Sequence, residues 1–324
     1  MLKPEPQSAG ELAQDHIMFR SFFALAIALL MPVGAIGEEA STKRSRIGYG
    51  LVFSNDLFGD GKDRWRTGSV TSSRIYSGAW QGQAPRRFGD LLELRIQGQI
   101  MAPENLRLPN AADRPWAGAL NFELHSHVAR GASEMSLGAG LSFVGPQTQL
   151  DDLQTSLHDL FSAPQPSAAV LSGQIGNKIR PVIAAEFGHQ VALSQGASLR
   201  PFVEARAGDE TYLRTGVDFT LGQLGQDGLQ VREHVTGQHY SAVAGATRGL
   251  TLTAGADIAY VADSLYLPEQ GGYALENLRH RARLGVKWQG EAMSAFYGLT
   301  YLSEEFSTQR EGQLSGSLQI QMRF

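Results

Sequence analysis

Apolar and polar side chains alternate over stretches of about ten residues in much of this chain. One such stretch has apolar side chains at every second position, namely Met293, Ala295, Tyr297, Leu299 and Tyr301. This period of two is typical of strands with one apolar and one polar face. Strands in soluble sandwiches usually span about 5–6 residues, whereas a tilted strand needs about ten to cross a bilayer. The pattern therefore favours a transmembrane barrel over a soluble sandwich.

Counting these stretches predicts an all-β fold, a transmembrane antiparallel up-and-down β-barrel of about 12 strands. The predicted strands lie near 46–54, 67–77, 90–101, 115–129, 132–144, 178–193, 198–208, 212–222, 237–250, 276–289, 291–303 and 312–324. The run Thr251–Val261 also alternates. We assign it to a long loop, because thirteen strands would place the two termini on opposite sides of the membrane.

Both ends of the chain favour export to the bacterial outer membrane. Residues 1–37 read as an N-terminal extension and signal peptide, with Met18 as an alternative start, and residues 38–324 as a single barrel domain. The apolar run from Phe22 to Met31 is too short for a spanning helix, and small residues that fit a cleavage site follow it. The last strand alternates up to Phe324, which resembles the terminal signal of outer-membrane barrels.

The charges indicate a polar interior and exclude some classes of function. The net charge of -4 gives no basic surface for nucleic acid, and the absence of cysteine excludes disulfides and cysteine-based zinc sites. Four cations share one face of a single predicted strand, and carboxylates lie on other strands. We expect a paired network inside a narrow lumen, with Arg279, Arg281, Arg283 and Lys287 facing Glu123, Glu186, Glu204 and Asp218.

Polar residues gather in the loops that an outward first strand would place outside the cell. Asn55 and Asp56 end the first strand, and the loops 102–114 and 145–177 lie on the same predicted rim. The third loop contains apolar residues at four-residue spacing over 151–161, which predicts a short helix carrying His158. Asn and Asp often only cap turns, and a lone loop histidine is commonly solvated, so these residues alone leave structural and catalytic interpretations open.

Five ordered motifs carry a resemblance to a known family. They are Asn55-Asp56, then Asp63-Arg64-x-x-Thr67-Gly68, then the run 113–118 (DRPWAG), then Val144-Gly145-Pro146, and then Gln154 with His158. The segment 300–306 (TYLSEEF) before the last strand is similar as well. In this order they resemble the LpxR family of lipid A 3'-O-deacylases, outer-membrane barrels that remove acyl chains from lipopolysaccharide. The resemblance spans about residues 46 to 324.

The resemblance implies an active site and a cofactor. Catalytic roles fall on Asn55, Asp56, Thr67 and His158, and calcium is required, with Asp56 and Asn55 as its expected ligands. The side chains suit this chemistry, because histidine can activate water near neutral pH and calcium takes hard oxygen ligands. No G-x-S-x-G motif suggests a serine nucleophile.

The sequence departs from the family at three places. The loop after the third strand has no lysine, so Arg107 is the expected substrate-binding cation there. Arg66 stands where a tyrosine usually precedes the threonine, and the tryptophan near the sixth strand is absent from 168–174. Arginine and lysine differ in shape and hydration, so the substrate fit can differ.

Three classes of function remain open. The first is a carboxylic ester hydrolase that acts on lipid A of lipopolysaccharide in the outer leaflet, as a monomer. The alternative is a non-enzymatic barrel, either a degenerate family member or a narrow pore, with a periplasmic binding sandwich as a third. The retention of Asp56 and His158 favours the enzyme, since an inert barrel could lose both.

Overall fold

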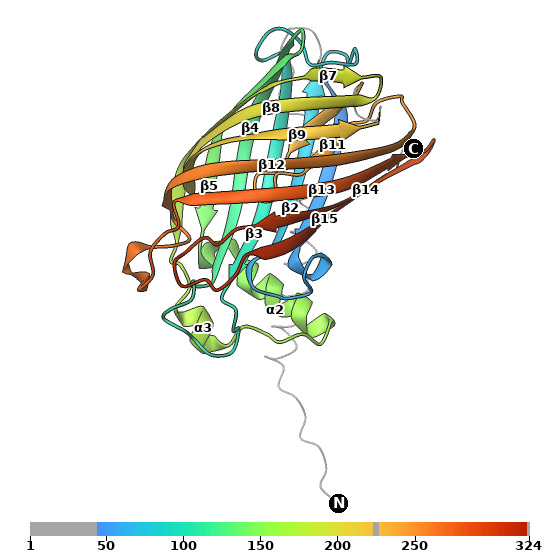
Figure 1. Ribbon diagram of the computed structural model, residues 1–324. Helices are drawn as coiled ribbons and strands as arrows, with labels where there is room; N and C mark the ends of the chain where they lie inside the picture. Colours follow the sequence, from blue (N-terminus) through green and yellow to red (C-terminus); the bar gives the residue numbers. More distant parts are fainter. Residues whose placement is uncertain (1–43, 223–226, 323–324) are drawn as a thin grey trace, which may run out of the picture. The chain divides into compact units, whose positions relative to one another are not determined.

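The computed structural model describes residues 44–222 and 227–322. Within them, twelve long antiparallel strands form a closed barrel (Figure 1). They are β1 (Ser45–Asn55), β2 (Trp65–Ser77), β3 (Leu91–Ala102), β4 (Ala117–Arg130), β5 (Ser133–Val144), β6 (Lys178–His189), β8 (Ala197–Ala207), β9 (Glu210–Leu221), β12 (Gly249–Ser264), β13 (Leu278–Gln289), β14 (Met293–Leu302) and β15 (Gln313–Met322). The predicted barrel class is confirmed, whereas the predicted signal peptide and Phe324 lie outside the described residues.

Alternation along each strand separates an apolar outside from a polar lumen. On β13, Leu278 and Leu284 are 63% and 66% exposed, while Arg281 and Arg283, which lie between them in the sequence, are buried. A soluble protein rarely exposes such a continuous apolar surface, but a bilayer covers it. No helix among the described residues is long and apolar enough to cross a membrane.

Two of the predicted elements are wrong and exchange their roles. The stretch 237–250 is not the ninth barrel strand, and Thr251–Val261 is not a loop, because the ninth strand is β12 (Gly249–Ser264). The preceding residues form a separate two-stranded sheet, β10 (Leu229–Arg232) and β11 (His239–Val243). This hairpin lies inside the barrel, where Tyr240 and Ala242 are fully buried. Both stretches alternate, so the pattern predicted the correct number of barrel strands but assigned the wrong stretch to the wall.

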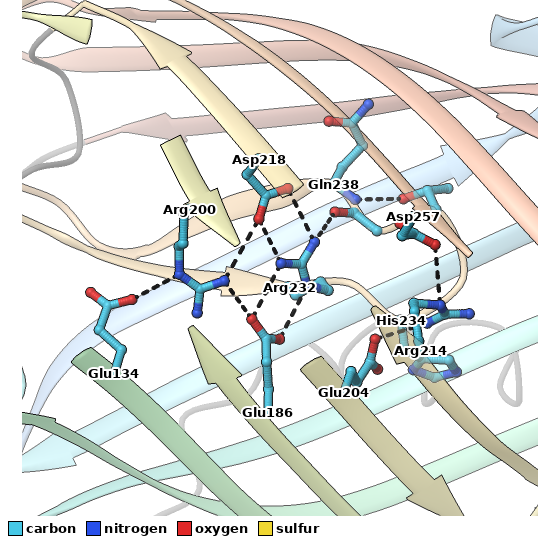
Figure 2. A network of polar contacts seen from close by, with 12 residues as sticks. Glu134, Glu186, Arg200, Glu204, Arg214, Asp218, Arg232, His234, Gln238 and Asp257 are labelled. Atoms are coloured by element: carbon cyan, nitrogen blue, oxygen red, sulfur yellow. Dashed lines mark hydrogen bonds and ion pairs between the residues drawn. The ribbon is translucent and has the colours of Figure 1, made fainter. Parts of the chain in front are cut away.

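Ion pairs cross the lumen between the hairpin and the wall, as Figure 2 shows. Arg232 of β10 reaches Glu186 on β6 at 3.1 Å and Asp218 on β9 at 2.7 Å. Arg200 on β8 shares both carboxylates, at 2.7 and 3.6 Å. A luminal network is thus present, but of the four expected carboxylates only Asp218 pairs with a β13 cation, and the other partners of these cations are Glu210, Glu305, Asp257 and Gln230. Glu123, Glu186 and Glu204 pair with arginines of other segments.

The first and last strands meet over a short seam. β1 and β15 pair only from Phe53 with Leu318 to Asn55 with Gly316. Beyond this seam, Gln319 of β15 bonds both the backbone N–H and the carbonyl of Ser241 in β11, at 2.9 and 2.8 Å. A side chain at Gly48 of β1 would meet the carbonyl oxygen of Ala242 at 2.2 Å. The hairpin therefore packs directly on the backbone of β1.

The short helices gather at the end where β1 leads into β2 (Figure 1). They are α2 (Leu150–Leu160) and α3 (Ala168–Ser172), with the 3-10 turns η1 (Asp56–Phe58) and η2 (Pro146–Thr148). The predicted helix over 151–161 is α2. The turn η3 (Glu269–Gly271), between β12 and β13, lies at the same end (Figure 1). The short strand β7 (Val191–Ser194) pairs with β8.

Candidate active site

The chain leaves β1 through a turn whose first two residues have different roles. Asn55 caps η1, because its Oδ1 accepts a hydrogen bond from the backbone N–H of Leu57 at 2.7 Å. Asp56 follows inside the turn and is fully buried. The turn-capping interpretation of the sequence therefore describes Asn55 and leaves Asp56 unexplained.

Asp56 is a buried carboxylate that has only neutral partners in the described part of the chain. Its Oδ2 accepts hydrogen bonds from the backbone N–H of Arg64 at 2.8 Å and from Nε2 of Gln313 at 3.3 Å. Burial raises the pKa of Asp56 to about 8, against the bond from Arg64, and the nearby charges of Asp63 and Asp60 add to the rise. An uncompensated buried carboxylate is costly, so a bound cation would relieve this site.

Asp63 joins the two segments of the site. Its Oδ2 lies 3.1 Å from Nε2 of His158, and its Oδ1 accepts a short hydrogen bond from the hydroxyl of Thr67. The same hydroxyl lies 3.4 Å from Oδ1 of Asp56. A continuous polar chain therefore runs from His158 on α2 through Asp63 and Thr67 to Asp56 on η1.

The ring of His158 is held from both sides. Its Nδ1 lies 2.7 Å from the carbonyl oxygen of Pro164. Because a carbonyl only accepts, Nδ1 carries hydrogen, and Nε2 is the nitrogen that faces Asp63. The ring is thus placed to exchange a proton through Nε2.

Helix α2 is fixed against the barrel by a buried contact. Nε1 of Trp116 donates to Oε1 of Gln154 at 2.7 Å, and both side chains are buried. Leu150 at the start of α2 is buried as well. Gln154 precedes His158 by one helical turn, so this contact sets the position of the histidine.

An ion-pair cluster lies in the lumen beside the site. Glu305 contacts Arg66 at 2.8 Å and Arg279 at 3.0 Å, and forms a 2.5 Å bond with Arg114. Burial alone would raise the pKa of Glu305, but these three arginines outweigh it and lower the pKa to about 2. Arg66, which stands where the family usually has tyrosine, is therefore a structural cation in this chain.

Four of the five candidate site residues lie close together. Asp56, Thr67 and His158 are linked through Asp63, and Asn55 directly precedes Asp56. Arg107 is exposed, and within the described residues no hydrogen bond or ion pair joins its side chain to the other four. The sequence assigned no role to Asp63, Gln154 or Gln313, although two of them lie in the recognised motifs.

The donor set suits a hard cation better than a soft one. Asp56, Asp63, Asn55 and Thr67 offer oxygen atoms, which calcium prefers. Among the described residues, no group of three or more acidic, histidine or cysteine side chains is already arranged to hold a metal. Amide and backbone oxygens or water would therefore complete the coordination, as they commonly do for calcium.

The fold and the location of this site define the class of the protein. A closed barrel with an apolar exterior, a charged lumen and a polar site at one end is a bacterial outer-membrane β-barrel. The family model described as outer membrane protein LpxR matches residues 22–324, and the chain belongs to this family.

A solved structure supports the fold. LpxR from Salmonella typhimurium superposes with a TM-score of 0.72 and 18% identity, covering 86% of this chain and 100% of that chain. The KdgM porin gives a TM-score of 0.39 and 6% identity, covering 85% and 99%. No curated protein matches the chain.

Proposed function

We propose that this protein is a lipid A deacylase that hydrolyses an acyl ester of lipopolysaccharide, at the 3'-O position by family resemblance. The observation that carries the proposal is the polar chain from His158 to Asp56, which joins side chains from α2, β2 and η1. Membership of the LpxR family supports the same chemistry.

In this proposal His158 is the general base. The Pro164 carbonyl keeps hydrogen on Nδ1, which leaves Nε2 to accept a proton from the attacking water. Asp63 then lies where it can stabilise the protonated ring, and the ring returns the proton to the leaving alcohol. The hydroxyl of Thr67 holds Asp63 in place and links it to Asp56.

Asp56 and Asn55 are the proposed calcium ligands, with Asp63 beside them. Calcium, when bound, would supply positive charge near the ester oxygen on which negative charge develops. Burial of Asp56 without a counter-ion supports a cation at this position.

The proposed orientation places the α2 end of the barrel outside the cell. The outer leaflet, which holds lipid A, then lies next to the site. The hairpin β10–β11 occupies the lumen and gives the alternative pore function no support.

Mass spectrometry of lipid A tests the proposal. Purified protein in detergent with calcium should release one acyl chain from lipid A, and His158→Ala should reduce this release by about 10²–10⁴-fold. Intact lipid A after incubation with folded wild-type protein would instead support the non-enzymatic barrel.

A further inference from the structure

The turn that carries Asp56 folds outward over the wall of the barrel instead of standing above it. The backbone and Cβ of Phe58 pack on Gly316 of β15, where an added Cβ would lie 2.4 Å from the carbonyl oxygen of Phe58. The backbone N–H of Asp60 then bonds the carbonyl of Leu314 at 3.3 Å. Residues 56–58 therefore form a bulge beside β15, after which the chain returns to its edge.

The two sides of this bulge differ in character. Asp56 is fully buried, whereas the next two residues, Leu57 and Phe58, are 67% and 45% exposed. The catalytic carboxylate and two exposed apolar side chains thus occupy one turn of three residues. The turn is held by backbone and Asn55 hydrogen bonds, so it does not require large apolar side chains at these two positions.

The exposed side chains continue the lipid-facing surface of the barrel. Tyr297 on the outer face of β14 donates its hydroxyl to the carbonyl of Phe58 at 2.7 Å. Tyr297 and Leu314 are both exposed on the outside of neighbouring strands. The bulge therefore adjoins the apolar outer wall of the barrel.

We propose that Leu57 and Phe58 form an acyl-chain docking surface, over which one acyl chain of an outer-leaflet lipid lies while its ester reaches Asp56 and His158. This inference rests on the proposed function and adds the route by which the substrate reaches the site, which is from the side of the barrel within the bilayer. Continuity with the outer apolar wall favours an acyl chain over a protein partner as the occupant.

The first test measures contact with acyl chains without enzyme turnover. The chain has no cysteine, so Phe58→Cys gives a unique site for a fluorophore. In vesicles of phosphatidylcholine brominated at the middle of its acyl chains, this label should be quenched at least half as strongly as one at Leu284→Cys on the outer wall. A label at Lys62→Cys, in the same loop but polar, should be quenched little.

The second test separates substrate docking from simple anchoring. Leu57→Ser with Phe58→Ser should raise KM for lipid A in vesicles by about 10-fold and leave kcat within about twofold, since apolar contact contributes to binding in proportion to its area. Hydrolysis of a soluble short-chain ester should not change. Phe88→Ser, an exposed phenylalanine at the opposite end of the barrel, is the matched control and should leave KM unchanged.

The outcomes distinguish this inference from the proposed function. A label at position 58 quenched no more than one at position 62 would overturn the docking surface, whether or not the protein is active. Equal KM values for wild type and the double variant would overturn it as well. A quenched label on a wild-type protein that releases no acyl chain would reject the deacylase and retain the acyl-chain contact.

Discussion

Asp63 offers the sharpest test of how the site works. Its carboxylate is the group that bridges His158 and Thr67, with one oxygen toward each. In Asp63→Ala the ring of His158 keeps only its bond to the Pro164 carbonyl. A hydrogen bond to a charged group contributes about 1.5–3 kcal/mol, and about 1.4 kcal/mol corresponds to tenfold in rate. We therefore expect kcat for deacylation to fall about 10- to 100-fold.

The assay is acyl release from lipid A, followed by mass spectrometry on detergent-purified variants. Asp159→Asn, which changes the exposed carboxylate next to His158 in sequence, is the matched control and should retain wild-type kcat. The double variant Asp63→Ala with His158→Ala should lose less than the product of the two single losses, since both changes remove the contact between these two side chains. Wild-type kcat in Asp63→Ala, or an additive loss in the double variant, would refute the reasoning.

Three further predictions concern the cation, the luminal cluster and the hairpin. Chelation of calcium should abolish acyl release. Asp56→Asn should raise the calcium concentration needed for half-maximal rate at least about tenfold. Excess calcium should partly rescue Asp56→Asn but should not rescue His158→Ala. Glu305→Gln should lower the free energy of unfolding by up to about 3 kcal/mol at pH 7. Because the pKa of Glu305 is lowered to about 2, urea titrations should show this difference shrinking as pH falls from about 4.5 towards 2. A difference that does not change with pH would contradict the prediction. Gly48→Val should cost about 1–3 kcal/mol by displacing the hairpin, while Gly78→Ala, with no atom nearby, should leave the urea midpoint unchanged.

Barrel class and strand number could be predicted from the sequence because a bilayer imposes a simple rule on every wall residue. Most outward side chains are apolar, so β13 and β14 are recognisable from alternation alone. The even number of strands was also predicted correctly, because an even number returns the chain to the side of the membrane on which it started. These constraints act along each strand separately and need no knowledge of its neighbours.

The luminal hairpin could not be predicted, since alternation says nothing about what covers the second face. In β11, Tyr240 packs inside the barrel near Gly50 of β1, and an apolar side chain serves that contact as well as it serves a lipid-facing one. A further signal was present in Thr251–Val261, whose Asp257 faces Arg281 and Arg283 of the neighbouring wall strand.

For the candidate site, the sequence could place the loops on one rim but not the contact between them. All of β2 to β5 lies between Asp63 and His158 in the sequence, and only the curvature of the barrel wall brings α2 to the β1–β2 connection. The role of Asp63 is a property of that contact. Arg107 was selected for its charge alone, and its side chain has no partner in the site.

The two interpretations of Asn55 and Asp56 can now be separated by physical cost. A turn gains from the Asn55 cap, which satisfies the N–H of Leu57 and would form whatever residue came next. Asp56 accepts a backbone hydrogen bond from Arg64, but no cationic side chain pairs with it among the described residues, and burial raises its pKa to about 8. A chain selected only to turn would do better with a small neutral residue there. The destabilising carboxylate is therefore the stronger sign of function, and relief of its charge by a bound cation is the simplest reason for keeping it at the head of a lipid-facing turn.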